Sequence, residues 1–158
     1  MRKFEKISKK QFDKDVEFGN YDSIILPNRK TIDSAGYDFI AFEDILIKKN
    51  EVVKIPTGVK LRLNSGEFLL MCVRSSMGFK YNVRLCNQIG IIDKDYYNNT
   101  DNEGHIWVCL QNQGNLDYLI KKGDSFAQGI ILQYNTCDND DVKNPRIGGL
   151  GSTNKEED

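Results

Sequence analysis

The chain has 158 residues, of which 39% are hydrophobic and 28% charged, a composition typical of one soluble globular domain with a sizeable core. Its 22 lysine and arginine residues nearly balance 23 aspartate and glutamate residues, and the formal net charge of -1 argues against the broad basic face of a nucleic-acid binder. No apolar run approaches the roughly 18 residues that cross a membrane, and the charged N-terminus lacks a signal-peptide core. We therefore expect a cytoplasmic protein with no membrane partner and no direct nucleic-acid binding.

The cysteines and the histidine argue against a structural zinc site. Cys72, Cys86, Cys109 and Cys137 are far apart and form no Cys-x-x-Cys pair, and His105 is the only histidine. We expect reduced thiols, most of them buried.

A short helix is predicted near the N-terminus. Ser8 and Gln11 have the spacing of a capping box, and the apolar Phe12 and Val16 follow them. The predicted helical segment, near residues 8–16, is peripheral to the rest of the chain.

The first half of the chain then has the pattern of short strands and turns. Strands are predicted over residues 23–26, 52–55, 59–63 and 68–73, with turns at residues 27–30, 56–58 and 64–66. Gly36 permits close backbone approach or a positive φ. Apolar and polar residues alternate strictly over residues 59–63, so one face of that strand is expected to be exposed to solvent. The apolar run 68–73 instead suits a strand buried on both faces. That run stops at Arg74, Ser75 and Ser76, which places polar groups at the end of a rigid strand.

The segment from Asn87 to Trp107 has the pattern of a β-hairpin. One apolar arm contains Ile91 and Ile92, the tip is rich in Asp, Asn and Gly, and a second arm covers residues 106–110. A pocket between two such arms presents peptide groups that can hydrogen-bond a flat polar ring, and Asp93 at its mouth can take a proton from water. This predicts a nucleotide site in outline; the alternative is an ordinary hairpin with a solvated acidic tip.

The remaining strands complete an all-β pattern. Residues 116–120 and 126–134 are predicted strands, and glycine-containing turns precede each of them. Short strands with turns at this spacing indicate a β-sandwich or jelly roll over residues 1–134. Residues 135–158 are acidic and then glycine-rich, which predicts a mobile C-terminal arm; the acidic run at 138–141 lacks the spacing of a calcium loop.

Two polar motifs have both a functional and an ordinary interpretation. Arg74, Ser75 and Ser76 offer a guanidinium and two hydroxyls to phosphate oxygens, or they form a plain turn. The glycine-rich residues 148–153 beside Arg146 resemble a phosphate-cradling loop without the lysine of a P-loop, or they form a disordered tail.

Five segments, taken in chain order, decide between these interpretations. They cover residues 35–39, 74–78, 87–96, 123–128 and 146–153. The residue types in these five segments, and the order of the segments, resemble the homotrimeric dUTPase family, in its bacterial and phage-like branch, over nearly the whole chain. The resemblance implies a distorted jelly-roll β-sandwich, described for the family as a β-clip, assembled as a homotrimer. Each active site would take its hairpin from one chain, its phosphate-binding strand ends from a second and its arm from the third.

The resemblance also implies a reaction: a dUTP diphosphatase that hydrolyses dUTP to dUMP and pyrophosphate and keeps uracil out of DNA. Asp93 would be the general base that activates water for attack on the α-phosphorus. Ser75 and Gln128 would act beside the scissile bridge, and the serines would not be nucleophiles. Mg²⁺ would be carried by the triphosphate without direct protein ligands, with Asp38 at most a water-mediated neighbour.

Substrate-binding roles follow from the same resemblance. Arg74, Ser75, Ser76 and Gln128 would bind the phosphates, and Arg146 the γ-phosphate. Asn87, Gly90, Ile91, Ile92 and a residue near Ile106 or Trp107 would read uracil beside Asp93, Tyr96 would lie under the deoxyribose, and Leu150, Gly151 and Ser152 would belong to the closing arm.

Three departures from the family pattern keep two alternatives open. Leu150 stands where the arm usually has a phenylalanine, Arg146 is one residue nearer the glycines, and residues 98–103 lengthen the hairpin tip. One alternative is a non-catalytic or weakly active dUTP-binding regulatory protein. The other is a dCTP deaminase of the same fold, which would need a catalytic glutamate where this chain has the Asp93 to Tyr96 pattern.

Overall fold

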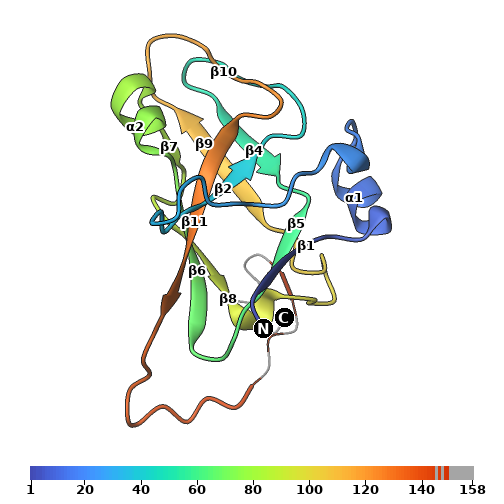
Figure 1. The fold of residues 1–158 in the computed structure, drawn as a ribbon, viewed down its shortest axis with the longest axis vertical. Helices are drawn as coiled ribbons and strands as arrows, with labels where there is room; N and C mark the ends of the chain where they lie inside the picture. Colours follow the sequence, from blue (N-terminus) through green and yellow to red (C-terminus); the bar gives the residue numbers. More distant parts are fainter. Residues whose placement is uncertain (145, 147, 150–158) are drawn as a thin grey trace, which may run out of the picture.

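The computed structural model describes residues 1–144, 146, 148 and 149, and Figure 1 shows their arrangement. The helices and strands follow in this order: β1 (Lys3–Lys6), α1 (Lys9–Asp15), the 3-10 turn η1 (Tyr21–Ser23), β2 (Tyr37–Ile40), β3 (Ile45–Ile47), β4 (Val52–Pro56), β5 (Val59–Arg62), β6 (Glu67–Cys72), α2 (Ser75–Tyr81), β7 (Val83–Leu85), β8 (Gly90–Asp93), the 3-10 turn η2 (Lys94–Tyr96), β9 (Trp107–Asn112), β10 (Tyr118–Ile120) and β11 (Ser125–Gln133). Among the described residues no helix combines the length and the apolar character needed to cross a membrane.

The strands pair antiparallel in two larger and two smaller sheets. One larger sheet has the order β2-β11-β6-β8 and the other the order β4-β9-β7, while β1 pairs with β5 and β10 with β3. The long strand β11 joins β2 on one edge to β6 on the other, and it crosses the middle of the molecule in Figure 1. The predicted all-β jelly roll is confirmed.

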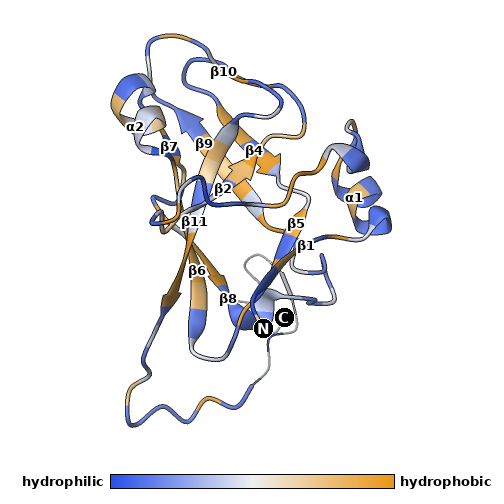
Figure 2. Ribbon diagram, in the orientation of Figure 1, coloured by the Kyte–Doolittle hydropathy of each residue, from blue (hydrophilic) through white to orange (hydrophobic). Residues whose placement is uncertain are grey.

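Alternating side chains from these strands form one apolar core. In β9 every second residue is buried, as expected for a strand with one face against the interior. Figure 2 shows hydrophobic residues concentrated in the strands, whereas the segment that follows β11 is mostly hydrophilic. The largest fully buried side chains of the core are Phe12, Phe39, Phe126, Ile7, Ile47, Leu69, Met77, Ile106 and Leu110.

The predicted N-terminal helix forms as α1, although its cap differs from the expected box. The Ser8 hydroxyl accepts a hydrogen bond from the Gln11 N–H at 3.0 Å, as an N-cap should. The Gln11 side chain instead donates to Asp15, and the Ser8 N–H donates to the carboxylate of Glu103. Burial of Phe12 fixes this helix to the core.

Three local predictions are wrong. Residues 23–26 do not form a strand, because the Asn20 side chain caps the turn η1 and Pro27 follows. The strand β6 is not buried on both faces, since its residues alternate between buried and half-buried. Residues 74–78 do follow the end of β6, but they form the N-cap and first turn of the helix α2 in place of a plain turn, and burial of Met77 anchors this short helix.

The predicted hairpin is also corrected. Its first arm, β8, pairs with β6, whereas its second arm, β9, pairs with β4 and β7 in the other sheet. The pattern of apolar arms and polar tip is present, but the two arms do not hydrogen-bond to each other as paired strands. They face each other across a space between two sheets, which becomes part of the candidate site.

The thiols and four short strands also differ from expectation. The four cysteines are free, as predicted, but Cys72, Cys86 and Cys109 are half-buried and Cys137 is exposed. The short strands β1, β2, β3 and β7 were not predicted, because three or four residues are too few for a clear alternating pattern.

Candidate functional site

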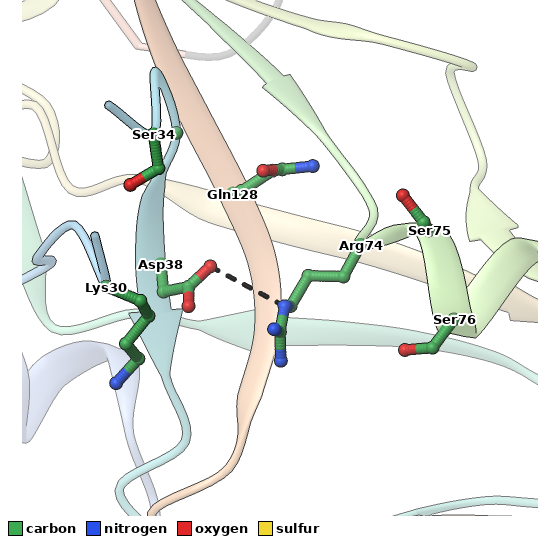
Figure 3. A pocket seen from close by; sticks show the side chains of 8 residues that line it. Lys30, Ser34, Asp38, Arg74, Ser75, Ser76 and Gln128 are labelled. Atoms are coloured by element: carbon green, nitrogen blue, oxygen red, sulfur yellow. Dashed lines mark ion pairs between the residues drawn. The ribbon is translucent and has the colours of Figure 1, made fainter. Parts of the chain in front are cut away.

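A polar cavity of about 320 Å³ lies where β2, β11 and the start of α2 meet. Figure 3 shows side chains of both charges directed into it, with the Arg74 guanidinium between the Asp38 carboxylate and the Ser76 hydroxyl. The residues that line the cavity are Lys30, Ser34, Gly36, Asp38, Arg74, Ser75, Ser76 and Gln128. The prediction that Arg74, both serines and Gln128 come together therefore agrees with the geometry.

The polar cavity depends on a close approach at Gly36. A Cβ atom at this position would lie 2.4 Å from Gln128 Oε1, so any larger residue would displace the glutamine. The Gln128 amide also donates to the carbonyl of Val73 at 3.3 Å, and this holds it between two segments. Of the two roles expected for Gly36, close approach is the one observed.

The charges in the polar cavity partly neutralise one another. Asp38 is buried, and its Oδ1 lies 3.6 Å from Nε of the half-exposed Arg74. The hydroxyls of Ser75 and Ser76 lie on an exposed turn, held in place by the buried Met77 of the same helix. A cation, hydroxyls and an amide at one surface can bind the oxygens of a phosphate chain.

A second cavity of about 200 Å³ lies between the two sheets, and it is less polar than the first. Gly90 lies at its wall, where a Cβ atom would be 3.0 Å from Met71, and Asn87 and Trp107 contribute polar groups beside apolar ones. The lining residues are Lys54, Met71, Leu85, Asn87, Gly90, Ile91, Ile92, Trp107, Val108 and Cys109. Burial raises the pKa of the Cys109 thiol to about 11, so this thiol is uncharged near neutral pH.

Asp93 ends β8 at the edge of this second region. Its side chain is 49% exposed, which leaves room for a water molecule, and its Oδ2 accepts a hydrogen bond from Arg146 Nη2 at 2.9 Å. Arg146 also donates to Asp95 at 2.9 Å, and its guanidinium lies 5.7 Å from the ring centre of Tyr96. Arg146 of the C-terminal segment is thus in contact with the predicted base of its own chain.

The strand register separates the two halves of the predicted site. Gln128 pairs with Cys72 of β6, whereas Asp93 pairs with Phe68 on the other side of the same strand. Four residues of β6 span about 13 Å and two strand spacings about 9.5 Å, so the backbones of Gln128 and Asp93 are roughly 16 Å apart. Within one chain, this separation is large for two side chains that act on the same phosphorus atom.

Some residues differ from the predicted set. Ile106 is fully buried, its N–H donates to Val59 and its carbonyl accepts from Thr57, so it is not free to read a base. Trp107, which was predicted as the alternative to Ile106, does line the second, less polar cavity. Leu150, Gly151 and Ser152 lie outside the described residues.

Lys30, Ser34 and Lys54 line the two cavities but were not predicted. Lys30 and Ser34 are placed by a loop in which Arg29 donates to the carbonyls of Ile32 and Ser34, and only their polarity is visible in the sequence. Lys54 belongs to a predicted strand, and its direction toward the cavity follows from its pairing with Cys109 of β9.

No group of three or more His, Cys, Asp or Glu side chains suited to a metal ion occurs within residues 1–144, 146, 148 and 149. Asp38 is the carboxylate that lines the polar cavity, and it is already paired with Arg74. A single paired carboxylate fits a metal that arrives with its ligand better than it fits a resident ion.

The family model for dUTPase matches residues 22–153 of this chain. The chain belongs to the dUTPase family. It is 42% identical over 132 residues to the deoxyuridine 5'-triphosphate nucleotidohydrolase of Lactococcus lactis subsp. lactis, a match that covers 82% of this chain and 88% of that relative. The deoxyuridine 5'-triphosphate nucleotidohydrolase of Desulfitobacterium hafniense is 34% identical over 136 residues, a match that covers 81% of this chain and 86% of that relative.

Solved dUTPase structures have the same fold. The dUTPase of Streptococcus mutans superposes with a TM-score of 0.70 at 34% identity, covering 86% of this chain and 98% of that one. The dUTPase of phage phi11 of S. aureus, at 19% identity and a TM-score of 0.68, covers 91% and 97% and supports the fold alone. Membership makes the chain a hydrolase of nucleotide metabolism, a dUTP diphosphatase.

Proposed function

We propose that this chain hydrolyses dUTP to dUMP and pyrophosphate with Asp93 as the general base. The Asp93 carboxylate is half-exposed and follows Ile92, which lines the less polar cavity, so it can hold a water molecule and accept its proton. The attack on the α-phosphorus would expel pyrophosphate, and Arg74, Ser75 and Gln128 would donate to the charge that develops on the phosphate oxygens. The uracil ring would enter the cavity between β8 and β9.

The strand register is the observation that carries the proposal of a shared site. Asp93 and Gln128 lie at opposite ends of β6 and on opposite sides of it. Reacting groups must approach to about 3–3.5 Å, so this separation favours a site in which a second chain supplies the phosphate-binding side. A homotrimer with three equal sites meets this need by cyclic symmetry.

Magnesium fits the polar cavity as a companion of the triphosphate. Asp38 would face the ion through water, and no other carboxylate among the described residues lines this cavity. When bound, the ion would reduce the charge of the phosphate chain. A solved phage phi11 dUTPase mutant is described with a structural Mg(II) ion, but at 19% identity it shows the fold alone.

A nucleotide panel tests the activity. Purified protein with Mg²⁺ and dUTP, dCTP, dTTP or UTP should release pyrophosphate from dUTP alone at an appreciable rate. Ammonia release from dCTP would identify a deaminase, and tight dUTP binding without pyrophosphate would identify a regulatory protein. Either result overturns the proposal.

Mixing two defective variants tests the shared site. Asp93→Asn and Arg74→Ala should each be nearly inactive as separate preparations. After unfolding and refolding together in equal amounts, about a quarter of the sites would combine an intact Asp93 with an intact Arg74 from another chain. Activity that does not recover, although mixed oligomers form, would show that each chain contains a complete site.

A further inference from the structure

The side chain of Tyr96 is held at its hydroxyl by the hairpin tip. The Tyr96 hydroxyl accepts a hydrogen bond from Asn102 Nδ2 at 2.8 Å and donates one to the carbonyl of His105 at 3.0 Å. The side chain is buried, with 4% of its surface exposed. Two directional bonds at the hydroxyl fix where the ring can lie.

Asn102 is itself fixed by the tip. Its Oδ1 accepts from Asn99 Nδ2 at 2.9 Å and from the Gly104 N–H at 3.1 Å. The Asn99 Oδ1 accepts the N–H groups of Asp101 and Asn102, and its Nδ2 also donates to the backbone carbonyl of Tyr96. Because Asn99 and Asn102 satisfy one another, the side chain of Asn102 cannot turn without breaking several bonds.

The tip backbone is built closely around the tyrosine. A Cβ atom on Gly104, whose φ is +79°, would lie 2.6 Å from the carbonyl oxygen of Tyr96. Asn98 and Glu103 also have positive φ values, of 58° and 59°, which costs free energy for residues other than glycine. A loop that adopts this conformation against its backbone preference is held by the contacts it makes.

We propose that Asn102 is a positioning residue that sets the ring of Tyr96 and thereby the preference for a deoxyribose over a ribose. The inference rests on the proposed function, in which Tyr96 lies under the sugar. A fixed ring leaves no room for a 2′-hydroxyl, whereas a ring free to tilt admits one and packs less closely on the deoxyribose. The pair Asn99 and Asn102 of the tip is then a specificity element.

Three variants test this role. Asn102→Ala removes the hydrogen bond to Tyr96, and Tyr96→Phe removes the hydroxyl that receives it. Asn98→Gly is the matched control: it lies in the same tip, keeps the positive φ and loses one exposed contact with Lys60 without touching Tyr96. Thermal melting of each variant shows whether the fold is retained.

The expected result is a change in KM and in sugar preference, not in kcat. Asn102→Ala should raise the KM for dUTP about threefold to tenfold and lower the preference for dUTP over UTP by a similar factor, because one buried hydrogen bond is lost. Tyr96→Phe should do the same, and the double variant should add little to either single change. Asn98→Gly should leave both quantities unchanged.

Other results overturn the inference. If Asn102→Ala lowers the melting temperature but leaves KM and the dUTP to UTP ratio unchanged, the tip is only structural. Additive effects of Asn102→Ala and Tyr96→Phe would likewise show that the two residues do not act together. If the wild-type protein does not hydrolyse dUTP, the proposed function fails, and calorimetry with dUMP and UMP then tests the positioning role by itself. In that experiment, a preference for dUMP that Asn102→Ala leaves unchanged overturns the positioning role.

Discussion

Asp93 is the residue proposed to hold and deprotonate the attacking water, and its half-exposed carboxylate accepts a hydrogen bond from Arg146 Nη2 at 2.9 Å. Asp93→Asn keeps the shape of the side chain but removes its ability to accept a proton. We expect unchanged melting temperature and dUTP binding, with turnover lowered by at least about a hundredfold. Pyrophosphate release under saturating dUTP measures this, and near-normal turnover would assign the base to another group.

His105 is buried and joins three parts of the chain. Its Nε2 accepts a hydrogen bond from the Gly58 N–H at 2.9 Å, so the proton is on Nδ1, which donates to Asp15 at 2.6 Å. Burial lowers the pKa of His105 below its usual value of 6.5, and the carboxylates of Asp15 and Glu103 oppose this shift only in part.

Acid should therefore destabilise the fold through His105. Above pH 6.5 the ring is neutral in both the folded and unfolded states; below that pH the unfolded chain takes up a proton that the folded chain resists. Urea unfolding at pH 7.5 and pH 5.5 should show a loss of stability that is smaller in His105→Gln. An equal loss in both proteins would assign the effect to the carboxylates.

At the scale of elements, the C-terminal segment is separable from the core. β11 ends at Gln133, the Tyr134 N–H donates to Gly66, and residues 134–144 are exposed. If the segment closes over the site, as the family resemblance implies, truncation after Tyr134 should leave the melting temperature nearly unchanged but lower turnover strongly. A truncated chain that fails to fold would instead make the segment part of the structural core.

A matched variant separates the arginine from the rest of the segment. Arg146→Ala in the full chain removes the contacts with Asp93 and Asp95 and the contact with the γ-phosphate that the family resemblance implies. Its turnover should lie between that of the wild type and that of the truncated protein. Steady-state kinetics of the three proteins side by side gives this order.

The elements that could be predicted from sequence are those specified by local pattern. Alternation in residues 59–63 gave β5 within one residue, and Gly66, with φ of +76°, forms the predicted turn. The partner of each arm of the hairpin could not be predicted, since pairing between sheets depends on contacts distant in sequence. The helix α2 was missed because it has only seven residues and contains glycine, so its stability comes from burial of Met77.

In the candidate site too, the residues that could be predicted are those specified by local sequence motifs. Asp38, Arg74, Ser75 and Gln128 belong to motifs whose residue types carry the chemistry, and the geometry brings them together. Lys54 could not be predicted, because its place in the other cavity depends on how two sheets face each other. The roles of these residues remain predictions for the experiments above.

At the scale of the whole molecule, a single chain leaves large apolar side chains uncovered. Ile25, Leu46 and Leu119 are each about half exposed, and Phe79 and Leu116 considerably more. Association would remove part of this surface from water, which favours an oligomer.

The native particle should be a trimer of about three times 18.1 kDa. Light scattering coupled to gel filtration measures the mass directly. A monomer that hydrolyses dUTP at full rate would contradict both the trimer and the separation of the two half-sites along β6.

Trp107, the only tryptophan of the chain, lies in the wall of the less polar cavity, with its ring centre 5.1 Å from that of His105. The tryptophan emission of the unlabelled protein therefore comes from one known place in each chain. A base entering the cavity changes the surroundings of that indole, so emission reports occupancy in the same cuvette in which pyrophosphate reports turnover. Stopped-flow recording of the indole emission beside a coupled pyrophosphate assay would time nucleotide entry and bond cleavage separately, with no label on the protein and no added mutation.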